Sequence, residues 1–93
     1  MKKGKTASGF KYQVDETRIF NDLRFTMALS KSNSKDIMKQ LEADAELVGL
    51  LLGEEQAQRL YDYVKEPDGM IPRDKVTAEV IEILDALGKE TNK

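Results

Sequence analysis

The sequence of 93 residues predicts a small single-domain bundle, mainly α-helical, with about four helices and a short N-terminal β-strand or extended segment. Apolar residues recur at intervals of three and four over most of the chain, which is the spacing of amphipathic helices. Turn-forming residues interrupt this spacing at residues 30–34, at Gly53 and at residues 65–69. A domain of this length buries only a thin core and often gains stability by association.

Residues 1–8 carry almost no apolar side chains, and we expect them to form a disordered basic N-terminus. Residues 10–14 then alternate apolar and polar side chains, the period of a half-buried strand. A lone strand needs a partner, so it would pair with a second chain or lie extended over the helices. We predict that residues 9–88 form the folded domain and that residues 89–93 are frayed.

The first helix is expected to follow the capping residues 15–17. One of its faces carries four large apolar residues, namely Ile19, Phe20, Leu23 and Met27. Phe25 and Leu29 lie roughly opposite, so the helix is apolar on two sides. Two interpretations stay open: the helix is sandwiched inside the bundle, or Phe25 and Leu29 contact another molecule.

The second helix should begin after the polar turn at residues 30–34, with Asn33 or Ser34 as its cap. Its continuous apolar stripe, which we expect to face the core, consists of Ile37, Leu41, Ala45, Val48 and Leu52. A second apolar side carries Leu47, Leu50 and Leu51. This side is either more core or a surface for a partner or an oligomer. Gly53 is expected to end the helix, because glycine readily takes a left-handed conformation.

Two further helices complete the expected bundle. The third starts with Glu54 and Glu55, since acids suit the positive end of the helix dipole. Its core stripe is Ala57, Leu60, Tyr61 and Val64, with Tyr63 pointing away. The last helix starts at Pro72 and ends at Gly88. Its stripe is Val76, Val80, Ile83, Leu84 and Leu87.

The composition and the motifs argue against several classes of function. Cysteine and histidine are both absent, which removes thiol chemistry, the commonest general base and the commonest transition-metal ligand. Residues 1–12 carry +4, whereas the rest of the chain, with 11 basic and 17 acidic residues, carries −6. Such an acidic body is a poor nucleic-acid binder. No stretch approaches the ~20 apolar residues of a membrane span. We therefore expect a soluble, cytoplasmic protein without a nucleic-acid or membrane partner.

Two segments have the outline of a functional motif but lack the side chains that the motif requires. The loop around Gly69 has the outline of a calcium-binding loop, but its first and last ligand positions would be Val64 and Lys75, which cannot supply the required oxygens. The last helix cannot read DNA, because its side away from the core stripe carries Glu79, Glu82 and Asp85. Without a metal-ligand spacing, a phosphate loop or a nucleophile beside a base, we expect neither a cofactor nor enzyme activity.

Four short stretches occur in a fixed order along the chain: residues 9–16 (GFKYQVDE), 50–56 (LLLGEEQ), 68–72 (DGMIP) and 79–83 (EVIEI). Together they resemble the tail assembly chaperones of long-tailed bacteriophages and prophages of Gram-positive bacteria, and the resemblance extends over residues 9–87. Members of this family have an acid-rich segment between their first two helices, where this chain has SKSNS at residues 30–34.

The resemblance implies a small, non-enzymatic protein of the bacterial host cytoplasm that is absent from the mature virion. It would bind the tape measure protein, keep it soluble, help to recruit tail tube protein subunits, and self-associate into rings or helical arrays. The apolar residues in surplus, which would suit such an interface, are Phe25, Leu29, Leu47, Leu50 and Leu51. The alternative is another small phage morphogenesis or adaptor protein that is retained in the tail or connector.

Overall fold

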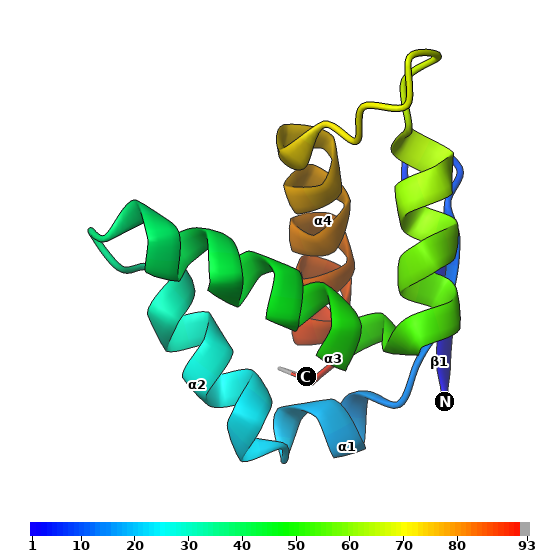
Figure 1. Cartoon of the computed structure of the whole chain (residues 1–93). Coiled ribbons are helices and arrows are strands. Elements are labelled where there is room, and N and C mark those ends of the chain that lie inside the picture. The colour runs from blue at the N-terminus through cyan, green and yellow to red at the C-terminus, as the bar shows by residue number, and fades with distance from the viewer. Residues whose placement is uncertain (92–93) are drawn as a thin grey trace.

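The computed structural model describes residues 1–91. Over this range a two-stranded antiparallel hairpin precedes four helices, and their order is β1 (Lys2–Lys5), β2 (Lys11–Val14), α1 (Glu16–Phe20), α2 (Leu23–Ser32), α3 (Ile37–Val64) and α4 (Arg73–Thr91). The predicted mainly α-helical fold with a short N-terminal strand is confirmed. Figure 1 shows that α2 lies against the first part of α3, that the hairpin lies beside its second part, and that α4 passes behind the first part.

The strand predicted at residues 10–14 is present, but the expectation of disorder before it is wrong. Lys2–Lys5 form β1, which pairs with β2 so that Gly4 lies opposite Tyr12. The Tyr12 ring occupies the space where a Cβ atom of residue 4 would be, so only glycine fits there. Backbone pairing and this close approach therefore order a segment that has no apolar residue of its own.

The outer edge of β2 is covered by side chains from α3 rather than by a second chain. The Gln56 Oε1 atom accepts from the Gln13 N–H at 2.7 Å, and the Gln56 Nε2 atom donates to the Gln13 carbonyl at 2.8 Å. Farther along, the Arg59 Nη2 atom donates to the Lys11 carbonyl at 2.9 Å. Since unpaired strand edges recruit other strands, these contacts protect β2, and the expected pairing with a second chain is not needed.

The single first helix that we predicted is divided into α1 and α2. Asp15 caps α1, and Asp22, with extended backbone angles, caps α2 by accepting from the Arg24 N–H at 2.9 Å. The break turns α2 so that Phe25 is buried, with 1% of its surface exposed, whereas Leu23 is 70% exposed. Of the face made by Ile19, Phe20, Leu23 and Met27, only Ile19 is therefore buried.

Helix α3 is bent at Gly53, where φ is 79° and ψ is 167°. The predicted break at this glycine is confirmed, because this backbone conformation is open to glycine and to almost no other residue. We call residues 37–52 the first segment of α3 and residues 54–64 its second segment. The N-cap is Asp36, not Asn33 or Ser34, and its carboxylate accepts from the Met38 N–H at 3.0 Å.

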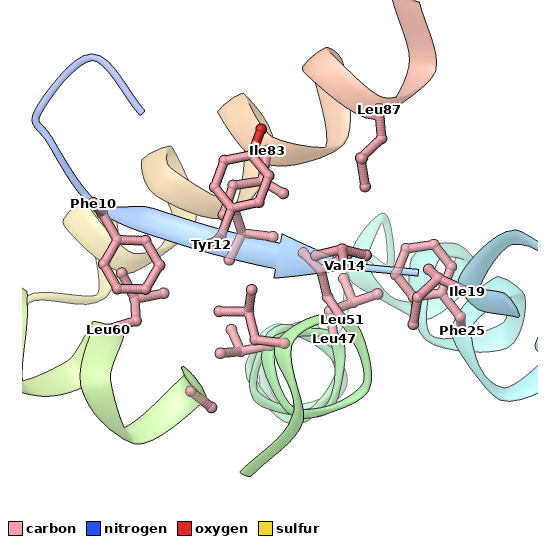
Figure 2. Close-up of a cluster of buried hydrophobic side chains, with 14 of the residues drawn as sticks. Phe10, Tyr12, Val14, Ile19, Phe25, Leu47, Leu51, Leu60, Ile83 and Leu87 are labelled. Carbon is pink, nitrogen blue, oxygen red and sulfur yellow. The ribbon is translucent and has the colours of Figure 1, made fainter. Parts of the chain in front are cut away.

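The core lies where the hairpin, α3 and α4 meet (Figure 2). Tyr12 and Val14 of β2 lie between Leu51 of α3 on one side and Ile83 of α4 on the other. The stripes predicted for residues 57–64 and 76–87 are confirmed, since each residue in them is buried or half-buried. Helix α4 does not end at Gly88, as we expected, but continues to Thr91. The remainder of the predicted frayed segment, residues 92–93, lies outside the described residues.

We predict that Gly53→Ala lowers the free energy of unfolding by about 1–3 kcal/mol, because alanine is strained at this positive φ and ψ near 180°. Gly49→Ala is a matched control in the same helix. Gly49 has helical angles and open space around its Cβ position, so the alanine should stabilise the protein by about 0.5–1 kcal/mol. Urea unfolding measures the change in the free energy of unfolding for both variants, and we expect opposite signs. Equal changes would contradict the bend at Gly53.

We further predict that Gln56→Ala opens the edge of β2. The Gln13 amide would lose its acceptor, so its hydrogen-exchange rate should rise, and the protein should lose about 1–2 kcal/mol of stability. Gln58→Ala is the control, because Gln58 bonds only to Asp62 on the same helix among the described contacts. Unchanged protection of Gln13 in Gln56→Ala would show that β2 does not depend on this side chain.

Candidate functional site

The five residues predicted as an interface do not form one surface. Three of them belong to the monomer core: Phe25, Leu47 and Leu51 are only 1%, 5% and 3% exposed. Leu50 is half-buried against the same core, and only Leu29, at 36%, is substantially open to solvent. Of the two interpretations of Leu47, Leu50 and Leu51, the structure therefore supports the core and not a free surface.

The structure instead has a groove bounded by the end of α2, the first segment of α3 and α4, with a volume of about 570 Å³. Leu41, Ala45 and Val48 of α3 form one wall, and Thr77, Ile81 and Leu84 of α4 form the other. Leu29 of α2 and Ile71, which precedes α4, line it as well. The groove is thus built mainly from apolar side chains on helices.

Several of these apolar side chains are open to solvent. Leu41 is 37% exposed, Ile71 is 41% exposed and Ile81 is 60% exposed. Leu41 and Ala45 belong to the stripe that we predicted to face the core, and that prediction is wrong for both of them and for the neighbouring Ile37. The prediction is confirmed for Val48 and Leu52, which are buried in the core together with Leu47 and Leu51. Leu41 and Ala45 of the same stripe line the groove.

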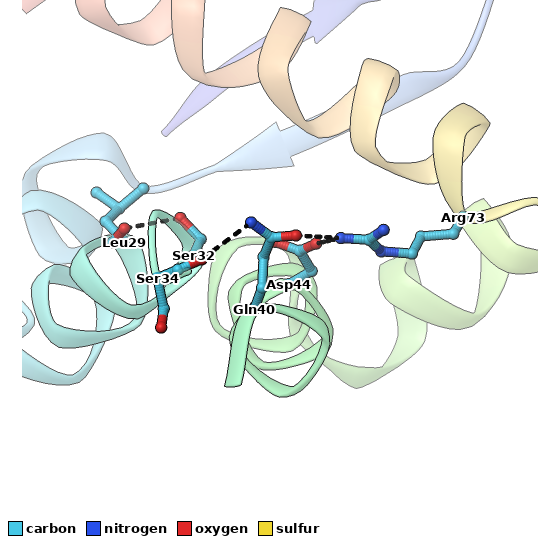
Figure 3. Close-up of polar contacts among 6 residues, drawn as sticks. All are labelled: Leu29, Ser32, Ser34, Gln40, Asp44 and Arg73. Carbon is cyan, nitrogen blue, oxygen red and sulfur yellow. Dashed lines mark hydrogen bonds and ion pairs between the residues drawn. The ribbon is translucent and has the colours of Figure 1, made fainter. Parts of the chain in front are cut away.

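A chain of polar contacts runs along one edge of the groove, from α2 across α3 to α4 (Figure 3). The Gln40 amide donates to the Ser34 carbonyl at 3.3 Å and accepts from Arg73 at 3.4 Å. The Arg73 guanidinium also forms an ion pair with Asp44, with 2.6 Å between Nη2 and Oδ2. These contacts join the start of α4 to the first segment of α3, so they fix the width of the groove at this edge.

Farther along, the turn of the N-terminal hairpin fastens α4 to α3. The Ala7 N–H donates to Glu82 Oε1 at 2.6 Å, and the Ser8 hydroxyl donates to Glu79 Oε1. The Tyr63 hydroxyl of α3 donates to the Ser8 carbonyl. Glu79, which we expected to be exposed, is 8% exposed, because this turn covers it. Helix α4 is therefore held in position by contacts other than those in the groove.

The perturbed titratable groups lie in structural contacts outside the groove. Burial raises the pKa of the Tyr12 phenol in the hairpin. At the cap of α2, hydrogen bonds from Arg24 lower the pKa of the Asp22 carboxyl. Over residues 1–91, no group of three or more acidic side chains could hold a metal ion. No helix in this range is long and apolar enough to cross a membrane.

Comparison with known proteins finds no matching protein family, curated protein or solved structure.

Ile81 and Ile71 were missed as candidate site residues by the analysis of the sequence. Ile81 lies outside the narrow core stripe of α4, on the side with the acidic residues, where an apolar side chain is unexpected. Together with Thr77 and Leu84 it makes a second stripe with spacing i, i+4 and i+7. This second stripe was the signal that could have located the groove.

We predict that Leu51→Glu unfolds the monomer, because it places an uncompensated carboxylate in the core at a cost of about 3–5 kcal/mol. Leu41→Glu, at an exposed position on the same helix, should change stability by less than about 1 kcal/mol. Circular dichroism during thermal unfolding distinguishes the two. If Leu51→Glu stayed folded and lost only self-association, Leu51 would be an interface residue and not a core residue.

Proposed function

We propose that this chain is a tail assembly chaperone of a long-tailed bacteriophage or prophage, acting by protein–protein binding on the tape measure protein. The observation that carries the proposal is the solvent-open apolar groove between the first segment of α3 and α4. The ordered resemblance of residues 9–16, 50–56, 68–72 and 79–83 to this family supports it independently.

The chemistry of such a chaperone fits an apolar groove. A tape measure protein is a long helical chain whose apolar stripes would aggregate in water before the tail is built. A groove lined by helices covers such a stripe by receiving a helix. Each leucine-sized side chain that is buried contributes about 1.5–3 kcal/mol before the cost of ordering, so a few contacts suffice for reversible binding.

The proposal extends to the rest of the family's role. The protein would act in the cytoplasm of the bacterial host, help to recruit tail tube protein subunits to the tape measure protein, self-associate, and leave before the tail is complete. Reversible binding suits this role, because a chaperone that leaves must be displaced by the subunits that replace it.

A retained morphogenesis or adaptor protein is the second candidate. The feature in its favour is apolar surface outside the groove, since Leu23, Ile37 and Met38 are 70%, 64% and 62% exposed. Such residues would suit a permanent interface in the tail or connector. The two candidates differ in one observable, because only a retained component is present in purified tails.

The test is co-expression with the candidate tape measure protein, which would be a long, helix-rich protein encoded beside this chain. We expect the soluble fraction of that protein to rise several-fold when this chain is present, compared with an empty vector. The physical reason is that the exposed apolar stripe of the long protein is covered before it aggregates. An equally insoluble neighbour in both cultures would reject the chaperone function.

A further inference from the structure

We propose that the open edge of β1 binds an extended acidic peptide of a partner protein as an additional strand, with its acidic side chains over the lysines on the solvent face of the hairpin. This site is separate from the groove, because the hollow over the hairpin and the groove share no lining residue. It goes beyond the proposed function and does not depend on it.

The solvent face of the hairpin carries three lysines. Lys5 of β1 lies directly opposite Lys11 of β2, and Lys3 lies opposite Gln13. These positions share one face, because side chains alternate along a strand and directly opposite residues point to the same side. The other face of β2 carries Tyr12 into the core, so the lysine face is the one that is turned to solvent.

An open hollow of about 730 Å³ lies along this face and is bordered by the start of the second segment of α3. Its charged side chains are four cations, Lys3, Lys5, Lys11 and Arg59, and one acid, Glu55, so their net charge is +3. The chain as a whole carries −2. Among the described residues, none of the three lysines forms an ion pair. Their charge is therefore not compensated within the structure.

The main-chain groups of Lys3 and Lys5 point away from β2. Along an antiparallel pair, residues that bond across to the other strand alternate with residues whose N–H and C=O point outward. Gln13 is of the second kind, because Gln56 of α3 binds both of its main-chain groups, and so is Lys11, two residues away. The opposite residues of β1 therefore point outward as well. Within residues 1–91 nothing bonds to them, so the edge of β1 is open whereas that of β2 is covered.

Protection of this edge from aggregation accounts for only part of the charge. Lysines on an edge strand discourage pairing with a second copy of the chain, and Lys3 and Lys5 are placed to do so. Lys11 is not, because it lies on β2, whose edge is covered by α3. It nevertheless lies opposite Lys5 at a position that is not hydrogen-bonded across the strands, where side chains are closest and like charges repel. An acidic side chain of a partner, placed between the two, would replace this repulsion by attraction.

The open edge and the charge together select a peptide strand. An added strand would bond to the main-chain groups of Lys3 and Lys5, and every second side chain of it would lie over the lysine face. Acids at these alternate positions complement the charge of +3. A helix uses its own main-chain groups internally and so cannot extend the sheet. Single-stranded nucleic acid stacks on exposed aromatic rings, and Tyr12, the aromatic residue that lines the hollow, is only 7% exposed.

The binding experiment uses the full chain and a synthetic peptide in which glutamate alternates with threonine. One control peptide has lysine in place of glutamate. A second control keeps the glutamates but has methylated main-chain nitrogens, so it retains the charge and loses the hydrogen bonds to the edge. We expect the glutamate peptide to bind at least about tenfold more tightly than either control in isothermal titration calorimetry. Equal binding of the methylated peptide would show attraction by charge alone and would overturn strand addition.

Two variants locate the site. Lys5→Gln should weaken binding of the glutamate peptide about threefold or more, and it should not lower stability, because it removes the repulsion from Lys11. Lys39→Gln removes the same charge at an exposed position outside the hollow and should bind as the unsubstituted chain does. Urea unfolding measures the stability of both variants. An equal loss of affinity in both would show that distant charge attracts the peptide and would overturn the site.

Hydrogen exchange tests the edge itself. The amides of Lys3 and Lys5 should exchange rapidly in the free chain and become protected when the glutamate peptide binds, because the added strand accepts from them. Unchanged exchange of both amides would overturn the proposal. If inorganic phosphate or a DNA oligonucleotide bound more tightly than the peptide and lost affinity in Lys5→Gln, another anion would be the occupant and the proposal would be wrong. A failure of the co-expression test rejects the chaperone function and leaves this site untouched.

Discussion

The bend of α3 at Gly53 is the constraint on which the other contacts depend. A straight helix of 28 residues would be a rod of about 42 Å that presents one continuous stripe to its neighbours. The glycine instead divides α3 into two segments with different partners. The first packs on α2 and crosses α4, and the second lies beside the hairpin (Figure 1). The angle at the bend also leaves room between the first segment and α4, and this room is the groove.

The hairpin also determines how the helices pack, because it contacts both α3 and α4 and so joins them. A two-stranded hairpin is marginally stable by itself, and here Lys5 and Lys11 even lie directly opposite each other. Its stability comes from the helices: Gln56 covers its edge, and Tyr12 is buried in the shared core. In return, its turn binds Glu79 and so secures α4. Helix α4 can therefore leave its second stripe uncovered without losing its position.

The sequence was sufficient to identify the buried face of a helix wherever one stripe was clearly more apolar than the rest of that helix. The stripe from Val76 to Leu87 and the break at Gly53 follow from spacing and from the conformational freedom of glycine. It was insufficient for helices that are apolar on two sides, because periodicity locates the stripes but does not say which one faces the core. For this reason Phe25 and Leu47 could be assigned to the core or to an interface, and the structure buries both. Strand β1 was not predicted, because it is ordered by backbone pairing with β2 and has no apolar pattern of its own.

The same ambiguity explains why the candidate interface residues were assigned to other positions than those that line the groove. A core and a partner-binding groove use the same residue types, so a surplus of apolar stripes indicates that a surface exists without locating it. In this chain both stripes of the first segment contribute to the core, one through Leu47 and Leu51 and the other through Val48 and Leu52. Leu47 and Leu51 fill the space beside β2, and Leu41 and Ala45 are left on the side that faces α4. The choice between them is made by the bend and by the hairpin, and the hairpin is remote from both stripes in sequence. The groove is therefore a consequence of tertiary packing, and its residues become recognisable only once the direction of α3 on each side of Gly53 is known.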